Sequence, residues 1–114
     1  MKQVFLAATV AFLATSALAH SPLEATVPEQ DAILDVAPNE IALDFKGKIR
    51  LTRVTLTLDS QQATDLDLGA FKGFLSDYAI PVEPMGSGAY EVEWRGLGDD
   101  GHPMNGTFSF TVKD

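Results

Sequence analysis

The sequence predicts an all-β domain, a β-sandwich of about seven short strands. Apolar residues recur with a period of two from Ile41 onward, which is the pattern of half-buried strands. Proline and glycine interrupt these runs at short intervals and supply the turns between strands. The 114 residues allow one domain. Strands that are apolar on one face bury that face when two sheets pack together.

Alternation is strong in four segments and weaker in three others. The strong segments are 41–45, 54–58, 90–94 and 108–112, and the weaker ones are 25–27, 63–68 and 80–82. Ile49 and Leu51 are out of phase with 54–58, so we expect a bulge or crossover near Thr52-Arg53.

Residues 68–78 are expected to form a short helix or an irregular loop, because Gly69 and Gly73 weaken a helix there. Large apolar side chains in the strong segments predict where the core lies. We expect that core to be built around Phe45, Trp94, Phe108 and Phe110.

The first 19 residues have the order of a secretory signal peptide. Lys2 lies in a short positive region, residues 4–14 are apolar apart from one threonine, and Ala17-Leu18-Ala19 forms a small-residue cleavage site. The apolar run is about half of the ~20 residues that span a bilayer. We therefore expect two parts, a cleaved signal peptide (1–19) and an exported domain (20–114) that is not inserted in the membrane.

Charge and cysteine content exclude several classes of function. Eight Lys and Arg against 16 Asp and Glu give a formal net charge of −8, and loss of Lys2 with the signal peptide would make it −9. Phosphate-binding surfaces are built from Lys and Arg, so nucleic acid is not an expected partner. The chain has no cysteine, which excludes disulfides, thiolate metal sites and a cysteine nucleophile.

The chain has two histidines, and each occupies a position where it could act as a metal ligand. Cleavage after Ala19 would make His20 the first residue, with a free α-amine beside its imidazole. His102 lies in the glycine-rich stretch 96–106, which we expect to be a loop of about ten residues between the two best strands. In Asp100-Gly101-His102, the glycine allows the carboxylate and the imidazole to converge. Alternatively, Asp100 caps backbone amides in a turn and His102 is solvated.

Taken together, these groups form a set of three nitrogen donors and one oxygen donor. The nitrogens are the α-amine and imidazole of His20 and the imidazole of His102, and the oxygen belongs to Asp100. Cu(II) prefers nitrogen and oxygen donors in a tetragonal plane. The set therefore favours one Cu(II) ion, provided that the first strand begins at the end of the sandwich where His102 lies.

Three further motifs are informative together: His20-Ser21-Pro22-Leu23 at the expected mature start, the strand 41–45, and the closing pattern W-R…D-G-H-P…G…F-x-F-x-V over residues 94–112. They resemble the corresponding segments of the CopC-type periplasmic copper-binding proteins. The resemblance implies an immunoglobulin-like Greek-key β-sandwich or barrel that binds Cu(II). It also implies that the ligands are His20, Asp100 and His102, with Asp100 selected over Asp99 by the D-G-H pattern.

The same resemblance sets expectations for partners and for departures from the family. It implies a periplasmic monomer that sequesters or carries copper for resistance or homeostasis and delivers it to an inner-membrane copper transport protein. Some members add a methionine-rich Cu(I) site, but this chain offers only Met85 and Met104 after residue 19. Lys46-Gly47 stands where several members place a glutamate near the copper.

Two other functions fit parts of the pattern. A histidine-brace copper oxygenase also uses an N-terminal histidine on an immunoglobulin-like sandwich, but 95 residues can hardly build the broad substrate face of such an enzyme. A metal-free interaction module is compatible with the fold class, because a sandwich does not determine function. The expected function remains copper binding without catalysis.

Overall fold

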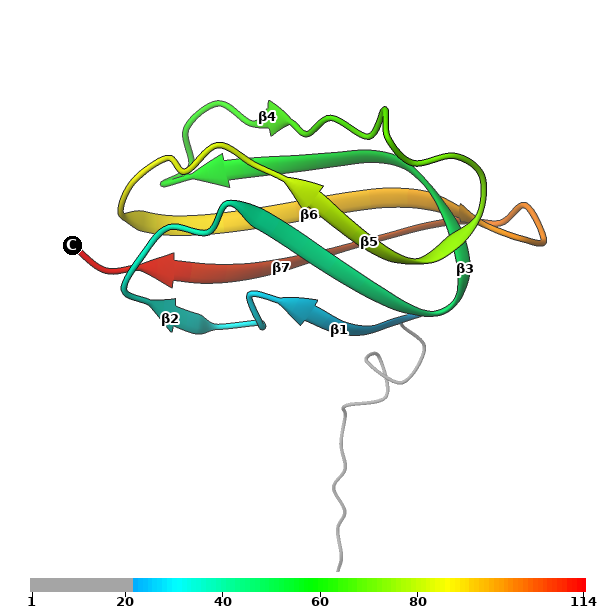
Figure 1. Ribbon diagram of the computed structural model, residues 1–114, viewed down its shortest axis with the longest axis horizontal. Helices are drawn as coiled ribbons and strands as arrows, with labels where there is room; N and C mark the ends of the chain where they lie inside the picture. The colour runs from blue at the N-terminus through cyan, green and yellow to red at the C-terminus, as the bar shows by residue number, and fades with distance from the viewer. Residues whose placement is uncertain (1–21) are drawn as a thin grey trace, which may run out of the picture.

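The computed structural model describes residues 22–114, and this part of the chain consists of strands and connecting segments without a helix (Figure 1). The strands are β1 (Leu23–Val27), β2 (Ala32–Leu34), β3 (Glu40–Leu58), β4 (Thr64–Asp65), β5 (Leu75–Pro81), β6 (Gly88–Gly98) and β7 (Pro103–Val112). No helix of the described residues is long and apolar enough to cross a bilayer. The predicted all-β class is confirmed.

The long strand β3 belongs to both layers of the sandwich. Its first half pairs with β1 on one side and β5 on the other, and its second half pairs with β6 and β4. The order β1-β3-β6-β7-β2 then completes the hydrogen-bonded path. Figure 1 shows β3 bending at one end of the molecule, where it passes from the first layer to the second.

The sequence predicted two separate strands within β3, and this division is wrong. The predicted irregularity near Thr52-Arg53 is confirmed, because the pairing of β3 with β6 shifts between Leu51 and Arg53. The bulge reverses the phase of the alternation without ending the strand. Leu51 and Val54 therefore both point into the core, although they are three residues apart.

The connection between β6 and β7 is also shorter than predicted. The two strands pair without interruption as far as Leu97 and Pro103, which leaves residues 99–102 as the turn. The end of β6 could not be predicted at its glycines, because a residue without a side chain shows no apolar–polar alternation. A Cβ at Gly96 would lie 2.8 Å from Ile49 Cγ2 and 2.9 Å from the Arg50 carbonyl oxygen, so close packing against β3 requires glycine there.

Three shorter strands were predicted less well. The segment 68–78 contains an irregular loop, as one alternative had it, but β5 begins within it at Leu75. Of the predicted strand 63–68, only Thr64–Asp65 forms a strand beside β3, and the Leu66 N–H adds one further bond of 2.8 Å to the Val54 carbonyl. The strand β2 was missed, because three residues that pair in parallel with β7 are too few to show a period.

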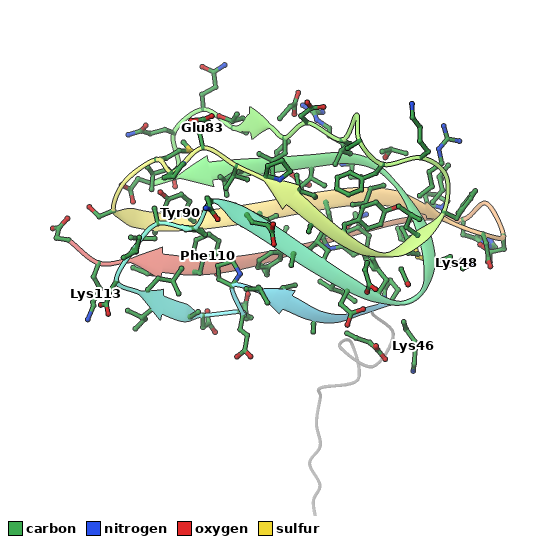
Figure 2. All side chains as sticks on the ribbon, in the orientation of Figure 1. Lys46, Lys48, Glu83, Tyr90, Phe110 and Lys113 are labelled. Carbon is green, nitrogen blue, oxygen red and sulfur yellow. The ribbon has the colours of Figure 1, made fainter. Side chains whose placement is uncertain are left out.

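The core lies where the large apolar side chains predicted it. Trp94 and Phe45 are almost completely buried, and their rings make an edge-on contact with centroids 5.0 Å apart. Tyr90 and Phe110 stack across β6 and β7 at 4.9 Å, and Figure 2 shows them within the sandwich. The Trp94 indole N–H has no hydrogen-bond partner among the described residues.

Candidate metal centre

Asp100 and His102 lie in the tight turn of the β6–β7 hairpin. The Gly98 N–H donates to the His102 carbonyl at 2.9 Å, and the Gly101 N–H donates to the Gly98 carbonyl at 2.9 Å. Gly101 has a φ of 86°, a left-handed conformation that favours glycine. This turn places the side chains of Asp100 and His102 on the same side of the backbone, where they meet.

The two side chains form a directly paired carboxylate and imidazole. Asp100 Oδ2 lies 2.8 Å from His102 Nδ1, and Asp100 Oδ1 accepts a hydrogen bond from the His102 backbone N–H at 3.1 Å. These two bonds lower the pKa of Asp100 below its ordinary value, the side-chain bond having the larger effect. When the neutral imidazole donates its proton from Nδ1, its lone pair is at Nε2, which can bind a metal.

Both side chains are open to solvent, with His102 76% and Asp100 59% exposed. The backbone bond to Asp100 also shows the capping role that the simpler alternative assigned to this residue. Two donors do not complete a metal site. Among residues 22–114, no group of three or more histidine, aspartate or glutamate side chains is arranged to hold a metal ion.

The third predicted ligand residue, His20, lies outside the described residues. The described chain does begin at the relevant end of the sandwich. The Pro22 carbonyl accepts a hydrogen bond of 2.7 Å from the Lys46 N–H at the bend of β3, and Ile49, three residues further on, pairs with Gly98 of the hairpin. Figure 1 accordingly shows the start of β1 and the β6–β7 turn at the same end of the molecule.

Met104 is placed beside the turn but packs inward. Its side chain is half-buried and contacts the hydrophobic core. A Cβ at Gly98 would lie 3.0 Å from the Met104 methyl group and 2.9 Å from Asp100 Oδ1, so both side chains cover that glycine. The structure thus agrees with a packing role for Met104.

Basic side chains are grouped at this end of the molecule, although the chain as a whole is acidic. Lys46, Lys48 and Arg50 are exposed along the bend of β3, and none of them forms an ion pair with another described residue. Figure 2 shows Lys46 and Lys48 at the hairpin end and Lys113 at the opposite end. The sequence K-G-K-I-R at 46–50 indicates this group of basic side chains, although the net charge of the whole chain is negative.

Comparisons with known proteins agree with this architecture. Residues 23–113 match the family model of the CopC domain. The chain is 31% identical to copper resistance protein C of Escherichia coli, over 98% of this chain and 96% of that protein. It is 30% identical to the protein of the same name from Xanthomonas campestris pv. juglandis, over 96% of this chain and 91% of that protein.

Solved structures show the same fold. The crystal structure of CopC from Methylosinus trichosporium OB3b superposes with a TM-score of 0.68 at 22% identity, covering 82% of this chain and 94% of that one. The crystal structure of PcoC, a copper resistance protein from Escherichia coli, gives 0.61 at 30% identity, with coverage of 80% and 98%. The match over nearly all of the described residues, together with the curated relatives, shows that this chain belongs to the CopC family.

Proposed function

We propose that residues 20–114 form a periplasmic protein that binds one Cu(II) ion and sequesters or carries it for copper resistance. The ligands would be the α-amine and imidazole of His20, Nε2 of His102 and the carboxylate of Asp100. The observation that carries the proposal is the exposed Asp100–His102 pair, which lies at the end of the sandwich where β1 begins. The relatives named copper resistance protein C support the metal and the role.

The donor chemistry suits Cu(II). Three nitrogens and one carboxylate oxygen match the tetragonal preference of that ion, and Cu(II) stands at the head of the divalent affinity order. Binding releases protons from the α-amine, with an ordinary pKa of about 7.7–8.0, and from imidazoles near 6.5. Asp100 would exchange its bond to Nδ1 for the metal, or would hold His102 while one oxygen binds.

The proposed role is capture and release of copper without chemical turnover. The donors come from one exposed hairpin turn and from the residue at the proposed chain start, so the ion is held at the surface, where another protein can reach it. We propose an inner-membrane copper transport protein as the recipient. The two methionines after residue 19 lie in different segments, at Met85 and Met104, which supports handling of Cu(II) and not a methionine-rich Cu(I) site.

Titration of the chain beginning at His20 with Cu(II) tests the proposal, followed by copper EPR and by the fluorescence of the single tryptophan, Trp94. His102→Ala and Asp100→Asn should each weaken binding by at least about tenfold. Asp99→Asn is the matched control, because it removes the neighbouring exposed carboxylate and should leave the affinity unchanged.

A second variant tests the contribution of the chain start. One extra residue ahead of His20 converts the α-amine into a peptide nitrogen and should weaken binding sharply. Equal Cu(II) affinity of the extended and native proteins would show that the amine is not a ligand. Equal affinity of the Asp99 and Asp100 variants would remove the carboxylate from the site.

A further inference from the structure

The strand β7 is covered along only part of one edge. On one side β6 pairs with it from Pro103 to Val112. On the other side β2 pairs only from Phe110 to Val112. Within residues 22–114, no strand pairs with this second side between Pro103 and Phe108. The first half of β7 is therefore an exposed sheet edge, and it begins directly after His102.

The hydrogen bonds of Ser109 show which backbone groups of this edge point outward. The Ser109 N–H donates to Gln30 Oε1 at 2.9 Å, and the Ser109 carbonyl accepts from the Asp31 N–H at 2.7 Å. Alternate residues of an antiparallel strand present their N–H and C=O groups to the same side. Thr107 and Asn105 consequently present theirs to the uncovered side, where no described residue pairs with them.

A groove runs beside this edge, between β7 and β1. It is open, has a volume of about 580 Å³, and its lining includes the apolar residues Leu23, Ala25 and Phe108. Glu24 and Glu29 are exposed on its lining, and neither forms an ion pair with a described residue. The groove thus combines unpaired backbone groups, apolar contacts and uncompensated negative charge.

We propose that this edge of β7 docks an extended basic segment of a partner protein, which adds to the sheet as one more strand. Backbone hydrogen bonds to Thr107 and Asn105 would hold the segment, as in other cases of strand addition to a sheet edge. Lysine or arginine side chains of the partner would face Glu24 and Glu29. A second copy of this chain fits less well, because pairing the same edges would bring two acidic grooves together in a protein of formal charge −8.

The proposal stands apart from copper binding, because none of the groups that carry it is a proposed ligand. It does place the partner beside the candidate copper site, since a strand added along Pro103–Thr107 would begin next to the hairpin turn. Docking and copper binding can therefore be measured separately, and the copper-free protein is the appropriate sample.

NMR titration of the copper-free, ¹⁵N-labelled chain beginning at His20 tests the proposal. The probe is an eight-residue synthetic peptide of alternating lysine and valine, and its control has glutamate in place of lysine. The lysine peptide should shift and protect the amides of Thr107 and Asn105, and the glutamate peptide should leave them unchanged. Binding should weaken as salt is added, because the charged groups are exposed.

Two sets of variants sharpen the result. Thr107→Pro removes the outward N–H without touching the β6 ladder and should weaken binding about 3- to 10-fold. Thr107→Val keeps that N–H and is the matched control. The double charge reversal Glu24→Lys with Glu29→Lys leaves the backbone intact and should weaken binding about tenfold at low salt, whether or not the proline variant folds.

Three results would overturn the proposal. The first is equal binding of the lysine and glutamate peptides. The second is equal affinity of the Thr107→Val protein and the charge-reversed protein for the lysine peptide. The third is a shift of the Thr107 amide that depends on protein concentration without peptide, which would assign the edge to a second copy.

Discussion

Gly106 and Gly47 provide a direct test of how the core packs. A Cβ at Gly106 would lie 2.8 Å from Trp94 Nε1, 3.0 Å from Cε2 and 3.1 Å from Cζ2. A Cβ at Gly47 would have nothing within 4 Å. Neither glycine has a positive φ, so Gly106→Ala and Gly47→Ala differ in steric contact and not in backbone strain.

The indole cannot move away from a new methyl group at low cost. Trp94 is 1% exposed, and the ring of Phe45 lies against it with a centroid distance of 5.0 Å. Overpacking a core costs about 1–3 kcal/mol, whereas alanine in place of glycine in a strand gains roughly 0.5–1 kcal/mol. We expect Gly106→Ala to lower the free energy of unfolding by about 1–2 kcal/mol and Gly47→Ala to leave it unchanged or slightly higher.

Thermal unfolding followed by far-ultraviolet circular dichroism measures both variants independently of the tryptophan environment. For a domain of this size, about 1 kcal/mol corresponds to roughly 4–8 °C, so Gly106→Ala should lower Tm by about 5–15 °C. Urea unfolding followed by Trp94 fluorescence should give the same order of stability. Equal unfolding temperatures for the two alanine variants would show that the indole does not lie against β7 as described.

Three further predictions concern individual polar groups. The His102 side chain lowers the pKa of Asp100, so the stability from this bond should be fully present above the ordinary value of 3.8 and be lost as pH falls from there through the lowered pKa. NMR titration of the carboxyl carbon should show a midpoint below 3.8 that moves up toward 3.8 in His102→Ala. A hydrogen bond with Asp77 raises the pKa of Asp44, so the stability from that pair is present at low pH and is lost as pH rises through the raised pKa. Asp77→Asn should return the titration midpoint of Asp44 toward 3.8 and increase the stability of the protein at neutral pH. An unchanged midpoint would contradict this. The buried Tyr78 hydroxyl bonds two backbone groups of β3, so Tyr78→Phe should cost about 1–3 kcal/mol in urea unfolding, and a loss below about 0.5 kcal/mol would argue against those bonds.

The sequence was most informative where side chains alternate. Trp94 and Phe110 lie in segments whose period of two is unbroken, and the predicted strands and core there are confirmed. It was least informative where the side chain is missing or the segment is short. Gly96 and Gly98 interrupt the alternation, so the pattern predicts a loop where β6 in fact continues, and the three residues of β2 are too few positions for a period.

The candidate site could also be predicted only in part, because its donors lie far apart in the sequence. The spacing of Asp100 and His102 predicted that they could converge, and in the structure they form a hydrogen bond. Whether a donor distant in sequence joins them depends on which end of the sandwich β1 occupies, and local patterns carry no such information. The ligand set of His20, Asp100 and His102 therefore stays a prediction for the copper titration to test.

The pairing of β2 with β7 has a consequence for the order of folding. Residues 32–34 find their strand partner only in residues 110–112, and β6, which completes the second layer on β3, also needs β7 along its other side. Native contacts of such long sequence separation form late and slowly. A chain that does not yet contain β7 lacks the strand that closes the second layer and that pairs with β6 beside the turn carrying His102, so the candidate site is among the last parts of the protein to be completed.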